Sequence, residues 1–461
     1  MTQAQRQRDH APCVERAVID ALAAADAAAS AFEAWSATGP NERRSKVHRV
    51  LELLAERSEA FVETMLAETG TSVAWARFNV QGAIGALREA ASLATQVGGE
   101  VIPSDKPGCL AMAVRAPAGV VLGIAPWNAP LLLGIRAIIM PLVCGNTVLL
   151  KASELCPRSH RMIGELFADA GFAPGSVNVI THDSAWAPAI VEALIAHRAV
   201  RRINFTGSTK VGRIIGELAG RHLKPVLLEL GGKAPLVVLE DADIDQAVGA
   251  AAFGAFMNQG QICMSTERIV VDEKIANAFA HRLAQKAQSL SAGDPRIGNP
   301  VLGALIGSAA ADRIEALVAD AVAKGASLLT PLQRDGTVLK AIVLDHVTAE
   351  MRVYGEESFG PIAPIVRVRS ADEAVRVAND SDYGLAAAVF GRDIARTLQV
   401  ARRMECGVCH INGATVNSEP QLPFGGTKAS GHGRFGGKAA IHEFTDLRLI
   451  TVQTEPQSFP L

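Results

Sequence analysis

A cysteine and a glutamate lie 34 residues apart in two glycine-containing motifs that could support covalent catalysis. Cys263 ends the run Asn-Gln-Gly-Gln-Ile-Cys, and Glu229 opens the run Glu-Leu-Gly-Gly-Lys. A thiolate is a strong nucleophile, and a nearby carboxylate can take up a proton or activate the water that releases a covalently held acyl group. Taken alone, however, such a pair is more often a small buried cysteine and a residue that ends a helix or strand.

Further polar side chains follow short aliphatic runs in the first half of the chain. The runs alternate with helical or loop segments, which favours parallel β-α-β units, and ligands bind at the carboxyl ends of the strands in such sheets. The predicted strands are residues 120–124, 147–150, 177–180, 203–205 and 226–230. The polar residues after them predict a cofactor site, and they lie in 126–128, 151–154, 206–209 and 229–231.

The remaining segments predict the elements that hold these residues in place. Apolar residues at helical spacing predict a mainly helical start, and a second β-α series that contains Cys263 predicts a separate catalytic domain. After the turn-rich stretch 98–108, the alternating residues 110–115 predict an exposed hairpin suited to subunit contact. The alternating residues 447–452 have no evident partner nearby, so we expect them to pair across a subunit interface. The helical segments are 14–35, 43–68, 276–290 and 309–324, and the further strands are 234–239, 267–271 and 407–411.

Composition excludes several classes of protein. The 461 residues are enough for two to three domains, and the formal net charge of −2 comes from intermixed acids and bases. We therefore expect no nucleic-acid or membrane partner, and a small-molecule substrate instead. The seven cysteines are an odd number and widely scattered, which predicts reduced thiols and a cytoplasmic location.

Two further patterns are interpreted as coincidental. Residues 116–135 carry no charged side chain, but three prolines and Asn128 interrupt them, which indicates a buried strand and a loop rather than a membrane span. The run Cys406-Gly-Val-Cys409-His410 matches the pattern of haem attachment. The first ten residues contain no apolar export segment, and the run itself is typical of a strand, so we expect neither haem nor metal there.

At this point the chain resembles the aldehyde dehydrogenase superfamily over nearly its whole length. Each motif alone is weak evidence, but seven of them occur in the order of that family. The motifs are Pro126-Trp-Asn128, Lys151-Ala-Ser-Glu154, Phe205-Thr-Gly-Ser-Thr209, Glu229-Leu-Gly-Gly-Lys233, Gly260-Gln-Ile-Cys263, Glu356-Glu-Ser-Phe-Gly-Pro361 and Pro423-Phe-Gly-Gly426.

The resemblance implies a mechanism without metal. Cys263 would attack the aldehyde to give a thiohemiacetal whose oxyanion is held by the Asn128 amide and the Cys263 backbone N–H. Hydride transfer would leave a thioester, and Glu229 would activate the water that releases the acid. A CoA-acylating relative would not need that base, and a nonenzymatic homologue would be expected to lose one of the three groups. For Asn128 alone, a turn residue after a strand is the simpler interpretation.

The resemblance also implies an NAD site, with NADP as the less favoured cofactor. Ser208 would contact the pyrophosphate near a helix N-terminus. Lys151 and Glu154 would contact the adenine ribose, where the carboxylate would repel a 2′-phosphate, although Lys151 could serve one and the two could equally form a solvated ion pair. Glu357 would contact the nicotinamide ribose and Phe359 the ring. The full predicted cofactor set is Ile124, Pro126, Trp127, Lys151, Ser153, Glu154, Gly207, Ser208, Val211, Leu230, Gly231, Glu357 and Phe359.

Within the superfamily the chain most resembles the branch that acts on salicylaldehyde, benzaldehyde and vanillin. A salicylaldehyde-like aromatic aldehyde is therefore the expected substrate, with vanillin, benzaldehyde or an aliphatic aldehyde as alternatives. Trp75 could stack on a ring, and Arg136 could meet a polar substituent. Each also has a purely structural interpretation, Trp75 as a packing residue of its helix and Arg136 as part of an internal salt bridge.

The implied fold is α/β, with an open parallel-sheet cofactor domain, an α/β catalytic domain and a small β oligomerisation arm. No Gly-x-Gly-x-x-Gly follows the first predicted strand, as expected for this family's own variety of cofactor domain. A homodimer or homotetramer is expected. Two departures from the family are a short region before the first helix and the absence of a Gly-rich stretch after residue 180. The predicted divisions are 1–97 and 118–230 for NAD, 231–431 for catalysis, and 98–117 and 432–461 for oligomerisation.

Overall fold

A six-stranded sheet forms the centre of the first half of the chain in the computed structural model, which describes residues 3–459. Five of its strands are parallel, as the alternating strand and helix pattern predicts, and a two-residue strand from the C-terminal region adds antiparallel at one edge. In spatial order they are β19 (Gly431–His432), β7 (Val226–Glu229), β6 (Val200–Thr206), β3 (Val120–Ile124), β4 (Thr147–Lys151) and β5 (Val177–Ile180).

Helices cover both faces of this sheet because successive strand side chains point to opposite sides. Val121 packs into a core formed mainly with five helices, whereas Leu122 packs into a core formed with three others. The first group is α2 (Pro40–Glu56), α3 (Ser58–Thr69), α4 (Val73–Leu93), α5 (Pro130–Val143) and α6 (Pro157–Asp169), and the second is α1 (Gln3–Ala37), α7 (Ala187–Ala196) and α8 (Thr209–Arg221). The predicted helical segment 43–68 is therefore two helices, divided at Arg57.

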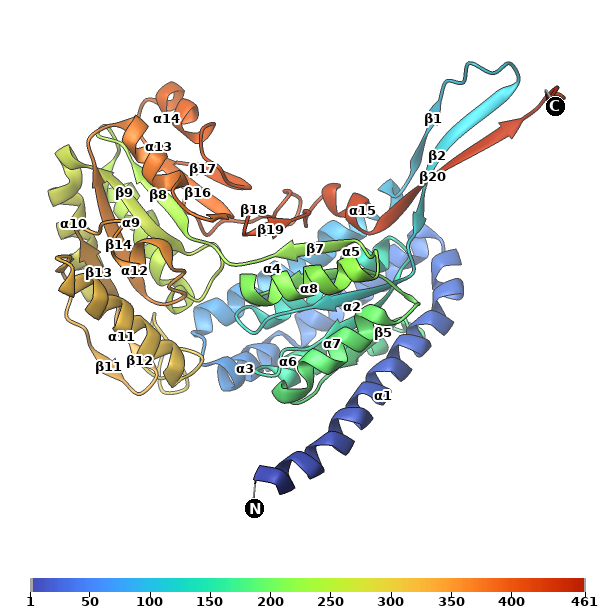
Figure 1. Cartoon of the computed structure of the whole chain (residues 1–461), viewed down its shortest axis with the longest axis horizontal. Helices are drawn as coiled ribbons and strands as arrows, with labels where there is room; N and C mark the ends of the chain where they lie inside the picture. The colour runs from blue at the N-terminus through green and yellow to red at the C-terminus, as the bar shows by residue number, and fades with distance from the viewer. Residues whose placement is uncertain (1–2, 460–461) are drawn as a thin grey trace.

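A seven-stranded sheet forms the second half, to the left in Figure 1. All of its pairings are parallel except the one that adds its two-residue edge strand. In spatial order the strands are β10 (Ser327–Leu328), β13 (Ile342–Asp345), β14 (Ile362–Val368), β9 (Thr266–Asp272), β8 (Ala234–Val238), β16 (Ala386–Phe390) and β17 (Val408–Ile411). The helices packed with it are α9 (Ile244–Phe256), α10 (Glu273–Gln288), α11 (Ser308–Ala323), α12 (Arg352–Gly355), α13 (Ala371–Asn379) and α14 (Ile394–Ala401).

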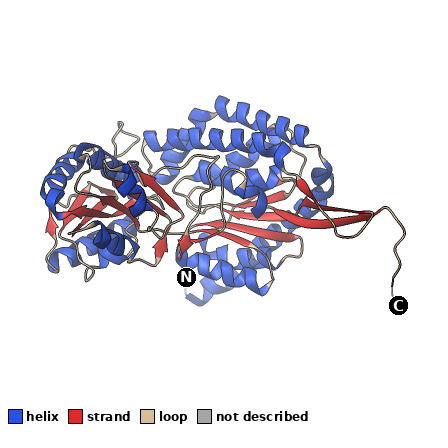
Figure 2. Cartoon of the chain, turned by 90° about the horizontal axis from the view of Figure 1, so that it is seen from above, coloured by secondary structure: helices blue, strands red, loops and turns tan. Residues whose placement is uncertain are grey.

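A third, three-stranded sheet projects away from the seven-stranded one (Figures 1 and 2). It contains β1 (Gly99–Ile102), β2 (Cys109–Pro117) and β20 (Thr445–Gln453). The first two form the predicted hairpin, but the expectation that the C-terminal strand needs a second subunit is wrong. Helix α15 (Ala439–Glu443) brings the chain to the open edge of β2, where β20 pairs with it along its whole length within the same chain.

The strands predicted within the uncharged stretch 116–135 and the run 407–411 are present. They are β3, which is buried, and β17, and the loop after β3 leads into α5, which begins at Pro130. Within residues 3–459, no helix is both long enough and apolar enough to cross a bilayer.

Candidate active site

Cys263 lies between the two large sheets, on the loop that leads into β9. The loop begins at a short 3-10 helix (Met257–Gly260) in which Asn258, Gln259 and Gly260 all have positive φ. Gly260 is required there because a Cβ would stand 2.1 Å from the carbonyl oxygen of Gly360. Gly232 is required on the other side, where a Cβ would stand 2.5 Å from the Cys263 carbonyl. The glycines beside both motifs thus let three backbone segments approach closely around the thiol.

Glu229 ends strand β7 and is fully buried. Its Oε2 accepts a hydrogen bond from Arg136 Nη2 at 2.9 Å, and the same nitrogen donates to Thr206 Oγ1 at 3.0 Å. Its other oxygen, Oε1, makes no hydrogen bond within the described residues. A buried carboxylate with one oxygen held by a cation and one oxygen free is suited to receive a proton from water.

Arg136 forms an ion pair with Glu229, whether or not it also contacts a substrate. Its guanidinium also lies over the ring of Phe435, with 4.4 Å between the guanidinium carbon and the ring centroid, and 5.5 Å from that of Phe424. The structural interpretation of Arg136 as part of an internal salt bridge is thus confirmed, and its partner is Glu229.

Asn128 follows β3 and is held from two sides. Its side-chain Nδ2 donates to the Gln261 carbonyl at 3.0 Å, and its own carbonyl accepts the indole N–H of Trp75 at 2.8 Å. An amide nitrogen carries two hydrogens, so one remains for another acceptor. Trp75 is 3 % exposed and stacks on Phe78, with 4.9 Å between ring centroids. It is thus both a packing residue of α4 and a support for the Asn128 backbone.

A cavity of about 180 Å³ brings four of the predicted residues together. Cys263, Asn128, Trp75 and Arg136 all line it. The rest of the lining is mainly apolar and was missed from the sequence, because it comes from segments far apart in the chain. It includes Phe78, Leu132, Leu133, Met264, Phe424 and Phe435.

The charges of Glu229 and Arg136 have opposite effects on the pKa of the Cys263 thiol. Burial and then the negative charge of Glu229 raise the pKa of Cys263 well above its usual range, whereas Arg136 lowers it. The thiol is therefore mainly protonated at neutral pH in this arrangement. Attack on a carbonyl needs the thiolate, so a proton must leave Cys263 as the reaction begins.

The predicted cofactor residues on the six-stranded sheet lie at the carboxyl ends of its strands. Ser208 is the N-cap of α8 and accepts the Val211 N–H at 3.4 Å, which leaves other amides of the first turn available to an anion. Lys151 and Glu154 form an ion pair, and His182 Nε2 lies 3.6 Å from the same carboxylate. The others are Ile124 at the end of β3, Pro126 and Trp127 after it, Ser153 after β4, Gly207 after β6, and Leu230 and Gly231 after β7.

Glu357 and Phe359 come from the other half of the chain and face these loops. The Glu357 carboxylate accepts the Gly232 N–H at 2.9 Å, and a Cβ on Gly231 would stand 2.6 Å from its Oε2. The ring of Phe359 meets Trp127 edge-on at 5.9 Å. Burial is the main cause that raises the pKa of Glu357 to about 7. A helix N-terminus for phosphates and carboxylates for ribose hydroxyls are a donor and acceptor set that fits a dinucleotide.

The aldehyde dehydrogenase family profile matches residues 7–450, which includes both large sheets and the site between them. The chain belongs to this family. It is an oxidoreductase of the aldehyde dehydrogenase type, and members of the family use NAD or NADP. The predicted fold class is confirmed by solved aldehyde dehydrogenases.

Several relatives of this aldehyde dehydrogenase carry aromatic aldehydes in their names. A vanillin dehydrogenase from Pseudomonas fluorescens is 58 % identical and a benzaldehyde dehydrogenase (NAD⁺) from Pseudomonas putida is 40 % identical, each over 96 % of this chain and over 92 % and 90 % of the relative, respectively. A crystal structure of a salicylaldehyde dehydrogenase from Pseudomonas putida G7 complexed with salicylaldehyde is 49 % identical, with a TM-score of 0.95 over 96 % of this chain and 92 % of that one.

Proposed function

We propose that this aldehyde dehydrogenase oxidises an aromatic aldehyde to the carboxylic acid with NAD, through a thioester on Cys263. The observation that supports it best is the apolar, partly aromatic cavity onto which Cys263 and Asn128 open. A planar ring can be desolvated there while its carbonyl reaches the thiol. The names of the relatives agree with this substrate class.

In the proposed mechanism, Cys263 Sγ gives its proton to solvent water and bonds to the aldehyde carbon. The free N–H of Asn128 stabilises the oxyanion that forms, and its bond to Gln261 holds the amide in place. Bound NAD would accept the hydride that leaves the aldehyde carbon, and the loss of that hydride leaves a thioester on Cys263. Water then adds to the thioester while Glu229 takes its proton, and Arg136 balances the charge of Glu229 beforehand. The C–S bond then breaks, the carboxylic acid leaves, and the proton held by Glu229 restores the Cys263 thiol.

The proposed NAD site uses the thirteen residues predicted above. Ser208 and the first turn of α8 take the pyrophosphate, Glu357 the nicotinamide ribose, and Phe359 packs against the ring. NAD is preferred over NADP because Lys151 is already paired with Glu154, and the carboxylate would repel a 2′-phosphate bound beside it.

The choice among aromatic aldehydes is the finer part of the proposal. We expect salicylaldehyde, vanillin and benzaldehyde to be oxidised with a higher kcat/KM than a medium-length aliphatic aldehyde, because a ring fills the cavity better. Steady-state assays with all four aldehydes and NAD test this, and a higher kcat/KM for the aliphatic one would contradict it. The variant Cys263→Ala must lose activity. If it reduced NAD at the parental rate, the covalent mechanism would be wrong.

We also propose that the segments keep the divisions predicted from sequence. Residues 1–97 and 118–230 bind NAD, 231–431 carry the catalytic loop, and 98–117 with 432–461 join subunits into a homodimer or homotetramer. One face of the arm carries the exposed apolar side chains of Val101, Ile450 and Val452, which are between 38 % and 68 % exposed, and such a strip gains free energy when a second copy covers it. Sedimentation of the full chain tests the assembly, and a monomer at micromolar concentration would contradict it.

A further inference from the structure

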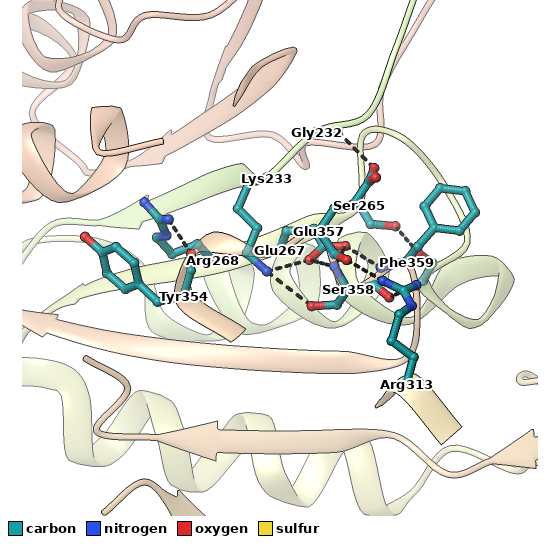
Figure 3. Close-up of polar contacts among 11 residues, drawn as sticks. Gly232, Lys233, Ser265, Glu267, Arg268, Arg313, Tyr354, Glu357, Ser358 and Phe359 are labelled. Atoms are coloured by element: carbon teal, nitrogen blue, oxygen red, sulfur yellow. Dashed lines mark hydrogen bonds and ion pairs between the residues drawn. The ribbon is translucent and has the colours of Figure 1, made fainter. Parts of the chain in front are cut away.

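A buried ion pair lies beneath the segment that carries Glu357 and Phe359 (Figure 3). Lys233 directly precedes β8, and Glu267 is the second residue of β9. Lys233 Nζ lies 2.7 Å from Glu267 Oε2, and the two residues are 1 % and 3 % exposed. Burying two charges is costly unless further hydrogen bonds satisfy them, so the remaining contacts of this pair indicate what it holds.

The remaining contacts go to the backbone of one short segment. Glu267 accepts the N–H of Ser358 at 2.8 Å on Oε2 and the N–H of Phe359 at 2.8 Å on Oε1. Lys233 also donates to Ser358 Oγ at 3.2 Å. Phe359 has a φ of 47°, in the left-handed region that a bulky residue avoids. Hydrogen bonds to a charged acceptor are stronger than neutral ones, and these two can hold that conformation.

Arg313 holds the same segment by its carbonyl groups. Its two terminal nitrogens donate to the Glu357 oxygen at 2.7 Å and the Ser358 oxygen at 2.6 Å. The backbone of residues 357–359 is thus fixed on both its N–H and its C=O sides. The side chains of Glu357 and Phe359 are left to reach Gly232 and Trp127, on the other face of the segment.

We propose that Glu267, with its charge balanced by Lys233, is a positioning residue that fixes Glu357 and Phe359 in the orientation needed to bind NAD. The proposal rests on the proposed function, because it takes those two side chains as cofactor contacts. Glu267 also lies four residues after Cys263, near the start of β9. The strand β9 therefore follows the loop that carries Cys263 and, through Glu267, holds the segment 357–359. The negative charge of Glu267 acts on Glu357 as well, since after burial it is the next cause that raises the Glu357 pKa.

The variant Glu267→Gln tests this inference. An amide keeps one acceptor oxygen but presents N–H groups towards Lys233, so we expect the Kd for NAD to rise at least tenfold, measured by calorimetric titration. Because the charge beside Glu357 is lost, the pH midpoint of NAD binding should also move below about 7. Loss of folded protein alone would lower the number of sites without moving that midpoint. The burst of p-nitrophenol from p-nitrophenyl acetate, which needs Cys263 but no NAD, should stay within twofold.

A matched control lies just beyond the C-terminal ends of the same two strands, where Glu240 follows β8 and Lys274 lies in the first turn of α10. Glu240 pairs with Lys274, also 34 residues apart in the chain, but on the exposed side, so Glu240→Gln should leave the Kd for NAD unchanged. If Glu267→Gln does not fold, Arg313→Gln provides a second test. It removes the hydrogen bonds to the carbonyl groups of residues 357 and 358, and it must weaken NAD binding in the same way. A folded variant that binds NAD within twofold of the parent overturns the inference. Failure of the parent to oxidise any aldehyde, with NAD still bound, overturns the proposed function instead.

Discussion

The variant Arg136→Gln removes the cation that stands beside the proposed base. Arg136 Nη2 lies 2.9 Å from a Glu229 oxygen, and the two side chains are 18 % and 0 % exposed. At an effective dielectric of about 20, two unit charges roughly 4 Å apart attract by about 4 kcal/mol. Breaking a buried pair by removing one partner typically costs about 3–5 kcal/mol. Because Arg136 is partly exposed, we expect Arg136→Gln to lower the free energy of unfolding by the lower end of this range, about 3 kcal/mol.

The loss of this contact should also appear in turnover. Arg136 holds Glu229 Oε2, which leaves Oε1 for the attacking water. Without that contact the carboxylate is no longer held in place, so kcat should fall by about 10- to 100-fold, because deacylation needs the positioned base. The initial burst of NADH, which precedes deacylation, should keep its amplitude. Stopped-flow and steady-state assays with saturating NAD and benzaldehyde measure both.

Two further variants make the result specific. Arg136→Lys keeps a charge and should restore part of the lost turnover. Arg367 pairs with Asp345 at 2.6 Å with similar exposures of 22 % and 4 %, but neither residue lines the cavity, so Arg367→Gln should lower stability without lowering kcat. A kcat for Arg136→Gln within twofold of the parent, which corresponds to roughly 0.4 kcal/mol, would refute the role assigned to the pair.

Three further predictions concern the thiol and the cofactor. Because the Glu229 charge raises the pKa of Cys263, Glu229→Gln should speed alkylation by iodoacetamide at pH 7.5 at least threefold, and slower alkylation would mean that Glu229 deprotonates the thiol. Burial raises the pKa of Glu357 to about 7, so its carboxylate forms as the pH rises through 7. The Kd for NAD should therefore fall about tenfold between pH 6 and 8. In Glu357→Gln the Kd should no longer depend on pH in this range. Glu154→Gln should raise kcat/KM for NADP about tenfold by removing the repulsion of a 2′-phosphate, and unchanged use of NADP would place the adenine ribose elsewhere.

The sequence predicts the fold well where local patterns are strong. The strands at Val120–Ile124 and Val177–Ile180 have the predicted bounds, because a buried aliphatic run between turn residues can hardly form anything else. The break at Arg57 was missed, since the apolar spacing continues through it. The partner of β20 was also missed, because β2 lies more than 300 residues earlier and no local signal records such a pairing.

The site shows the same division. Motifs predict Cys263, Glu229 and Asn128 as candidate catalytic residues. The structure places Cys263 and Asn128 on one cavity, with Glu229 close to the thiol. The contact between Arg136 and Glu229 could not be derived, because it depends on how α5 lies across the end of β7. The same holds for Glu267, whose four hydrogen bonds come from segments about 35 and 90 residues away.

The proposed covalent path is tested most directly by a pre-steady-state burst experiment on Glu229→Gln. With NAD and benzaldehyde in excess, the variant should release about one NADH per site quickly and then nearly stop, and intact-protein mass spectrometry should find the benzoyl group on Cys263. The parent should show no stable adduct under the same conditions. Steady turnover of the variant at the parental rate, or a burst of NADH without any acyl group on Cys263, would contradict the account.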